Sequence, residues 1–322
     1  MHAFRESWTG PRGACSKRTM ALSGYKRSDI SFPSAGLSCG AWLYRPAGGT
    51  IAKRPIVVLG HGLGATKDMG LDEYAAGFAQ AGYLALAFDY RHFGASEGMP
   101  RQLANIGRQR EDWRAAIDFA RTIEGADPGR VVLFGISFGG GHVIVSAARD
   151  KHVAAVIAQC PFTSGYASSR TVPPLTTLGI AWLGLRDLFN ASTGRDPVLV
   201  PLAGRPGQIA LMTTRDAWDG FYGQVPPGGQ AINGIAARIG FSMALSFPGR
   251  RARDIACPVL FGICGKDTVA PIGPTLRYAA KARKAEIIRY PCGHFDIYHG
   301  THFDRISHDM RRFLERHVPV GE

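Results

Sequence analysis

The stretch that most constrains this chain is residues 131–141, Val-Val-Leu-Phe-Gly-Ile-Ser-Phe-Gly-Gly-Gly. An apolar, β-branched run typical of a buried strand meets a Gly-x-Ser-x-Gly core and continues into residues 142–149, which have a helical pattern. Gly135 and Gly139 lack the Cβ atoms that would clash where the chain doubles back. In such a turn the serine is held in a strained conformation with its hydroxyl exposed. The motif therefore predicts Ser137 as a nucleophile, although a simple glycine-rich turn is the alternative.

Strand and helix patterns alternate along most of the chain. Helical periodicity or composition predicts helices at residues 71–81, 108–124 and about 303–317. Extended apolar segments predict an antiparallel hairpin at 30–46 and further strands at 55–59, 83–89, 131–136, 153–158, 258–263 and 286–290. This alternation predicts an α/β fold with a mostly parallel, eight-stranded sheet and helices on both faces.

One interval interrupts this alternation. Residues 163–253 are too many for a single crossover between parallel strands, and they mix helical segments with Pro/Gly-rich stretches. We expect them to form a cap inserted over the edge of the sheet where open α/β sheets bind ligands. An independent second domain and a dimerisation arm are the alternatives. The hydrolase-like core is then residues 23–162 and 254–322, and residues 1–22 are expected to be a poorly ordered N-terminal extension.

The net charge of +13 does not indicate a nucleic-acid partner. The basic residues are scattered, and no basic stripe is interleaved with aromatic residues. The chain has no uninterrupted apolar run long enough to span a bilayer, and its N-terminus lacks the apolar segment of a secretory signal. The sequence thus predicts a cytoplasmic protein that binds neither nucleic acid nor membrane, and it is compatible with a homo-oligomer.

The six cysteines do not indicate a metal site or a disulfide framework. None belongs to a Cys-x-x-Cys pair, and no group of histidines and cysteines has the spacing of zinc ligands. Several lie in apolar runs, where cysteine is usually a small core residue. We therefore expect free thiols in a reducing compartment, with no metal ligands and no cofactor.

Several motifs, together with the serine motif, resemble those of an α/β-hydrolase. They are His61-Gly62 after the third strand, residues 89–96 after the fourth, Gly265-Lys266-Asp267 and Gly293-His294. Their order along the chain, serine, then aspartate, then histidine, is the one that this fold uses. The segments around residues 60–67 and 88–91 also resemble the branch containing acetyl-xylan esterases, X-Pro dipeptidyl-peptidase-like hydrolases and polyketide-transferase-like esterases. The resemblance implies the α/β-hydrolase fold and a hydrolytic serine.

Asp267 and His294 follow predicted strands, at the edge of the sheet where Ser137 emerges. A serine hydroxyl is a weak nucleophile at neutral pH, so His294 would accept its proton and later give it to the leaving group. Asp267 would hold the imidazole tautomer and stabilise the imidazolium. The competing candidates are Asp296 for the acid and His61, His142, His299 and His302 for the base.

The remaining predicted site residues would bind the substrate. The backbone N–H of Phe138, at the start of a helix, would supply one oxyanion-hole donor, and the resemblance places the second at Leu63. Aromatic residues of the predicted cap are expected to line an apolar pocket: Trp182, Trp218, Phe221 and Tyr222. Asp216 and Asp219 are expected to face solvent, although such a pair could instead bind the amino terminus of a peptide.

These observations predict a serine hydrolase that cleaves small to medium apolar carboxylic esters through an acyl-enzyme intermediate. A serine nucleophile disfavours haloalkane dehalogenases and epoxide hydrolases, which resemble this chain but have aspartate at that position. The alternatives are an aminopeptidase or amidase of the X-Pro dipeptidyl-peptidase-like type and a non-catalytic binding protein on the same fold.

Overall fold

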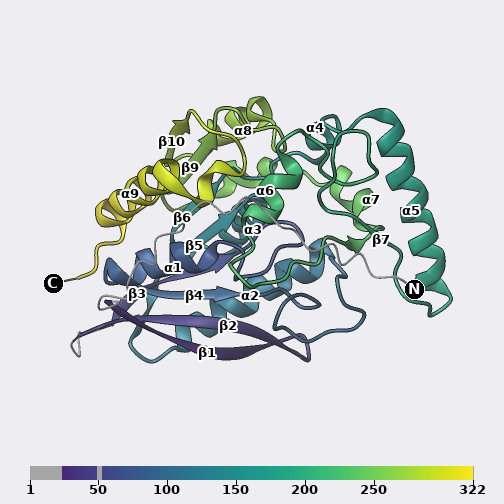
Figure 1. The fold of residues 1–322 in the computed structure, drawn as a ribbon. Coiled ribbons are helices and arrows are strands. Elements are labelled where there is room, and N and C mark those ends of the chain that lie inside the picture. The colour runs from purple at the N-terminus through teal and green to yellow at the C-terminus, as the bar shows by residue number, and fades with distance from the viewer. Residues whose placement is uncertain (1–23, 49–52, 322) are drawn as a thin grey trace.

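The computed structural model describes residues 24–48 and 53–321 (Figure 1). The N-terminal extension expected at residues 1–22 lies outside these ranges. Within them the chain forms a twisted central sheet with helices packed on both faces, and a group of helices and loops at one end of the sheet (Figure 1).

The central sheet has eight strands in the order β1-β2-β4-β3-β5-β6-β9-β10. The strands β2 and β4 run antiparallel, as do β1 and β2, and all later neighbours are parallel. This arrangement confirms the predicted mostly parallel sheet with an antiparallel start. The strands are β1 (Tyr25–Ser34), β2 (Leu37–Pro46), β3 (Arg54–Gly60), β4 (Leu84–Phe88), β5 (Ala126–Ile136), β6 (Val153–Gln159), β9 (Val259–Cys264) and β10 (Ala285–Tyr290).

Two apolar clusters, one on each face of the sheet, form the core. Because side chains alternate along a strand, Ile56 and Val58 of β3 belong to one cluster, whereas Val57 and Leu59 belong to the other. The first face is covered by α2 (Ile106–Thr122), α3 (Phe138–Arg149) and α8 (Ile272–Ala279), and the second by α1 (Leu71–Gln80) and α9 (Gly300–His317). Burial on both faces explains why the parallel strands are continuous apolar runs.

Residues 163–253 contribute α4 (Gly165–Ser169), α5 (Pro174–Ser192), β7 (Leu199–Val200), α6 (Ala217–Gly223), β8 (Ile235–Ala236), α7 (Ile239–Ala244) and most of the 3-10 helix η1 (Pro248–Asp254). The strands β7 and β8 form a separate two-stranded sheet. The long helix α5 stands at the edge of the molecule, beside α7 and β7 (Figure 1). The segment follows β6 and precedes β9, so it lies at the ends of the parallel strands.

A partly buried ion pair holds α5 in place. Asp187 is fully buried and accepts hydrogen bonds from the Nε and Nη2 atoms of Arg238, at 2.6 and 2.9 Å. Its carboxylate also accepts from the backbone N–H groups of Val198 and Arg238, both at 2.9 Å. The four bonds satisfy a carboxylate that would be costly to bury alone, and they tie α5 to the chain entering α7.

Candidate active site

The turn between β5 and α3 holds Ser137 in an unusual backbone conformation. Its φ is 54° and its ψ is −113°, a region that a residue with a Cβ rarely adopts. The N–H of Ser137 donates to Gln159 O at 3.0 Å, and its carbonyl accepts from Phe162 N at 2.8 Å. A Cβ at Gly139 would lie 2.6 Å from Gly60 O and from His61 O, so the motif glycine allows α3 to approach β3 closely.

The structure brings Ser137, His294 and Asp267 together in a chain of hydrogen bonds. His294 Nδ1 lies 2.7 Å from Asp267 Oδ2, and His294 Nε2 lies 3.1 Å from Ser137 Oγ. Because a carboxylate can only accept, Nδ1 carries the proton toward Asp267 and Nε2 is free to accept from the serine hydroxyl. The three side chains follow β5, β9 and β10, whose carboxyl ends meet at one edge of the sheet.

Asp267 and His294 are nearly excluded from solvent. Their side chains are 2% and 4% exposed. The Oδ1 atom of Asp267 accepts from the backbone N–H groups of Val269 and Ala270, at 2.9 and 2.6 Å, which fixes the carboxylate. Burial alone would lower the pKa of His294, but the charge and hydrogen bond of Asp267 outweigh it and raise this pKa above its ordinary value of 6.5. The site can therefore take up a proton on His294 and stabilise it.

The competing acids and bases have other partners. Asp296 Oδ2 accepts from the N–H of Gly293 at 2.7 Å. His142 is buried with its Nε2 2.9 Å from Gln109 Oε1, His299 Nε2 lies 2.9 Å from Gly223 O at the start of α9, and His302 is on α9 itself. Of the histidines in the described residues, His294 is the one that is hydrogen-bonded to Ser137.

The loop after β3 is fixed beside Ser137 by a buried polar network. A Cβ at Gly62 would lie only 3.4 Å from the Cβ of Ser137, so the next residue, Leu63, is placed at the same site. In this network the fully buried carboxylate of Asp89 accepts hydrogen bonds from the backbone N–H and the Nζ of Lys67, both at 2.7 Å. His61 Nδ1–H donates a hydrogen bond to Gly62 O at 2.9 Å, which further restrains the loop.

Ser137 opens into an apolar cavity of about 440 Å³. Leu63 and Phe138, the two predicted oxyanion-hole residues, also line it. Most of its other walls come from residues 163–253, including Ile180 and Ala181 of α5 and Phe241 and Met243 of α7. Most of the atoms that line the cavity are carbon. The cavity therefore suits an apolar group of a substrate whose reacting atom lies beside the Ser137 hydroxyl.

The four cap aromatics that the sequence favoured do not line this cavity. Trp182 is 63% exposed on the outer side of α5, because the helix turns Thr177, Ile180 and Ala181 inward instead. Phe221 is buried in the core, with Tyr222 packed against the same cluster. Trp218 packs on Tyr222, with ring centroids 4.7 Å apart. The prediction of these pocket residues is therefore wrong, although the insertion does supply most of the cavity.

Asp216 does not simply face solvent, as the sequence suggested. It is partly buried, and Thr268 Oγ1 donates to its carboxylate at 2.9 to 3.0 Å. A Cβ at Gly293, directly before His294, would lie 3.8 Å from Asp216 Oδ2. The charge of Asp216 also contributes to the raised pKa of His294. Asp219, by contrast, is exposed, so the two acids have separate environments.

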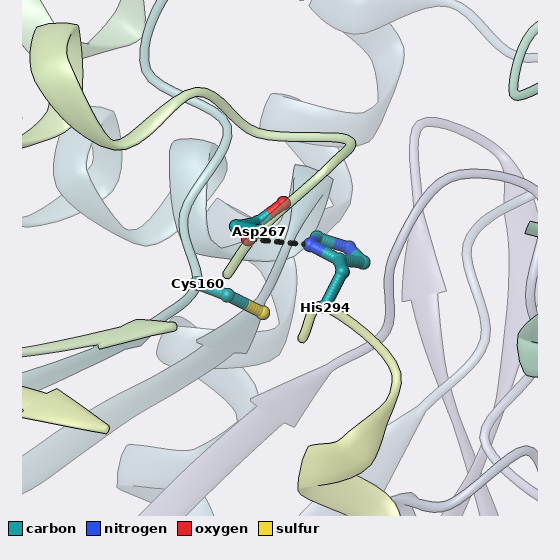
Figure 2. A group of neighbouring side chains, drawn as sticks. All are labelled: Cys160, Asp267 and His294. Atoms are coloured by element: carbon teal, nitrogen blue, oxygen red, sulfur yellow. Dashed lines mark hydrogen bonds and ion pairs between the residues drawn. The ribbon is translucent and has the colours of Figure 1, made fainter. Parts of the chain in front are cut away.

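Cys160, which no sequence motif marked, lies beside the hydrogen-bonded pair (Figure 2). Its sulfur and one ligand atom each of Asp267 and His294 lie within 4.8 Å of one another, which is close enough to surround a metal ion. However, Asp267 and His294 are already hydrogen-bonded, and burial raises the pKa of the Cys160 thiol, which opposes the thiolate that a metal needs. The geometry therefore favours a packing role for Cys160.

Asp216→Asn is expected to move the acidic limb of the pH dependence of kcat/KM to lower pH. A general base must be neutral, so activity falls as the pH drops through the pKa of His294, and Asp216 helps to raise that pKa. The measurement is kcat/KM for one ester between about pH 5 and 9. Asp219→Asn, with an exposed side chain on the same helix, is the control. An unmoved limb in Asp216→Asn would contradict the expectation.

Sequence comparison finds a matching family model and related proteins. Residues 51–194 match a family model described as serine aminopeptidase, S33. The quorum-quenching protein AidA of Acinetobacter baumannii (strain MDR-ZJ06) is 47% identical over 292 residues, which cover 91% of this chain and 95% of that protein. Polyketide transferase GrgF of Penicillium sp. is 29% identical over 191 residues, covering 59% of this chain and 62% of that one.

Solved structures show the same fold. The crystal structure of the α/β hydrolase GrgF from Penicillium sp. sh18 has a TM-score of 0.78 at 24% identity and covers 91% of this chain and 99% of that one. Est1E of Butyrivibrio proteoclasticus, solved with ferulic acid bound, has a TM-score of 0.62 at 15% identity and covers 90% of this chain and 99% of that one. Within residues 24–48 and 53–321, no helix has both the length and the apolar character needed to traverse a lipid bilayer. The fold and the 47% identity to AidA along 91% of the sequence establish that this chain belongs to the α/β-hydrolase family.

Proposed function

We propose that the protein is a serine hydrolase that cleaves carboxylic esters with apolar acyl groups. One observation carries the proposal: Ser137, His294 and Asp267 are linked by hydrogen bonds of 3.1 and 2.7 Å at the wall of an apolar cavity. This is the arrangement that serine hydrolases need, because the hydroxyl requires a base and the base requires an orienting carboxylate.

The first half of the reaction acylates the enzyme. Ser137 Oγ attacks the ester carbonyl carbon while its proton passes to His294 Nε2, and Asp267 stabilises the resulting imidazolium. The carbonyl oxygen becomes an oxyanion, which the backbone N–H groups of Leu63 and Phe138 stabilise. When the tetrahedral intermediate collapses, the bond to the alcohol breaks and His294 gives its proton to the departing alkoxide.

The second half restores the free enzyme. His294 Nε2 removes a proton from a water molecule, whose oxygen attacks the acyl carbon bound to Ser137 Oγ. The same two N–H groups stabilise the second oxyanion. Collapse releases the carboxylic acid, and the proton on His294 returns to Ser137. The cycle consumes one ester and one water, and it requires no cofactor.

The cavity supports an apolar substrate. Its walls include Phe138, Phe162, Leu211 and Met212, with few polar groups to satisfy a charged or strongly hydrated ligand. The relative AidA is named a quorum-quenching protein. This name adds one class of substrate to test, signal molecules that contain an ester bond, because hydrolysis of that bond would inactivate the signal. Residues 163–253, which form most of the cavity, would serve as the cap.

An aminopeptidase or amidase is the second candidate. The matching family model is described as a serine aminopeptidase, and the partly buried carboxylate of Asp216 near His294 could pair with a substrate ammonium group. The same catalytic residues would cleave an amide. The apolar walls of the cavity favour the ester, because they offer little else to a peptide.

The proposal predicts a dependence of rate on acyl length. We expect kcat/KM for p-nitrophenyl esters, from acetyl to dodecanoyl, to rise about fourfold per added methylene until the cavity is filled, since burying one CH₂ contributes about 0.8 kcal/mol. Ala181→Phe fills part of the cavity and should move the optimum to shorter chains. Ala191→Phe, on an exposed turn of the same helix, is the matched control.

An aminoacyl p-nitroanilide tested alongside separates the candidates. Turnover of the anilide without turnover of any ester would replace the esterase with the aminopeptidase. Binding of an ester with no turnover of either substrate would indicate a non-catalytic binding protein.

A further inference from the structure

A stripe of large apolar side chains runs along the outer face of α5. Its members are between 56% and 82% exposed. They follow one another at intervals of three, four, three and four residues, so they lie on one side of the helix. We call this set the α5 stripe: Leu175, Leu178, Trp182, Leu185 and Phe189. Contiguous exposed apolar side chains of this size are uncommon on monomeric proteins, and such patches often mark interaction surfaces.

The helix that carries the stripe is fixed from its other side. Asp187 accepts four hydrogen bonds within the insertion and ties α5 to Arg238. A Cβ at Gly184 would lie 2.6 Å from Phe241, which indicates that this glycine allows α5 and α7 to pack closely. Thr177, further along the inner face, lines the cavity. The stripe is therefore a preformed surface on a rigid helix rather than a segment waiting to fold inward.

We propose that the α5 stripe binds the same stripe of a second copy of this chain, which makes the protein a homodimer. The alternating spacing of three and four residues is the spacing by which two helices pack along each other, and on α5 it lies on the exposed face rather than on the face that packs against the fold. A two-fold axis lets one apolar surface pair with itself and closes the assembly at two copies. The chain itself therefore provides a suitable partner, which is a helix with the same apolar spacing.

The charges on α5 favour a second copy over a lipid surface. Arg186 is the one exposed charged residue between Pro174 and Ser192, since Asp187 is buried. A helix that lies on an anionic membrane usually presents several basic residues beside its apolar face. Two copies of α5, by contrast, can approach with little like-charge repulsion. The narrow, nearly uncharged stripe therefore suits a helix partner better than a bilayer.

The central residue of the stripe gives a geometric expectation. Two stripe members precede Trp182 and two follow it, so a two-fold axis through the middle of the stripe brings Trp182 beside the partner's Trp182. This holds whether the two helices run parallel or antiparallel. Fluorescence and cross-linking at this position can therefore report the interface.

The first test is the mass of the full chain in solution. We expect light scattering after size exclusion to give twice the chain mass of 34.6 kDa. The double substitution Leu178→Asp with Leu185→Asp places four charges in the dimer interface and should halve that mass, with the circular dichroism spectrum retained. Met99→Asp is the matched control, because Met99 is 78% exposed and lies outside α5. It should leave the dimer intact.

The second test traps the interface covalently. Trp182→Cys should form an intermolecular disulfide with oxidised glutathione, which accepts the two electrons and two protons that the paired thiols lose. Met99→Cys, whose exposed side chain lies outside α5, should remain uncross-linked. Because the cysteines native to the described residues are wholly or partly buried, the wild type is the background control.

Three results would overturn the dimer. They are a single-chain mass at every concentration, a dimer that survives both aspartates, and monomers that bind anionic phosphatidylserine vesicles through α5. The proposal is independent of the esterase, since inactive Ser137→Ala should dimerise like the wild type. A failed dimer and a failed esterase are thus distinguishable.

Discussion

Ser137→Ala is expected to lower kcat for ester hydrolysis by a factor of about 10⁶, with the fold unchanged. The substitution removes the atom that bonds to the acyl group, and His294 Nε2 loses its partner at 3.1 Å. Alanine can keep the cavity and the neighbouring backbone bonds, because those bonds use the main chain of residue 137. Burst and steady-state kinetics with a p-nitrophenyl ester measure the loss, and thermal unfolding checks the fold.

Ser168→Ala provides the matched control for this loss. Ser168 also lines the cavity, but its hydroxyl is not hydrogen-bonded to His294. Its substitution should change kcat by less than about tenfold, which is about 1.4 kcal/mol in activation free energy. Substantial ester turnover in Ser137→Ala would show that another group performs the chemistry and would end the proposed mechanism.

Asp267→Asn is expected to lower kcat by about 10⁴, the effect seen when a triad carboxylate becomes an amide. An amide can present an N–H to Nδ1 and so stabilise the tautomer whose Nε2 carries the proton and cannot act as a base. The residual activity should also show its acidic limb at lower pH, because burial lowers the pKa of His294 once the charge of Asp267 is gone. The kinetics and the pH profile test these two consequences separately.

Asp296→Asn is the control for that experiment. Asp296 lies two residues from His294 and accepts from Gly293 N, but it makes no bond to the imidazole. We expect it to retain most of the activity. If Asp296→Asn were the more damaging substitution, the carboxylate that orients His294 would be wrongly assigned.

The fold was predictable because its signals are local. Strands buried on both faces need apolar runs such as residues 131–136, and the turn at Ser137 needs glycines where a Cβ would collide with the backbone. The chain order of Ser137, Asp267 and His294 then places all three at one edge of a parallel sheet. The structure confirms that sheet and brings the three side chains within hydrogen-bonding distance.

The cavity was not predictable in the same way. Trp182 and Ala181 are neighbours in the chain, yet the first is exposed and the second lines the cavity. Which face of α5 turns inward depends on tertiary contacts such as those of Asp187 and Gly184, which no local pattern reveals. The sequence shows the apolar spacing of α5. Its aromatic residues, however, do not indicate which face of the helix lines the cavity. Cys160 had no motif, because only the packing of β6 beside β9 brings it to Asp267.

The separation of the proposed catalytic side chains from most of the cavity walls has an evolutionary consequence. Ser137, Asp267 and His294 are anchored by strands of the central sheet, whereas Ile180, Met243 and most other wall residues belong to the insertion at 163–253. Substitutions in the insertion can therefore change which molecules are accepted without disturbing the proton transfers. Selection could diversify substrate preference along one continuous stretch of about ninety codons, and a library confined to that stretch is the economical way to redirect the enzyme.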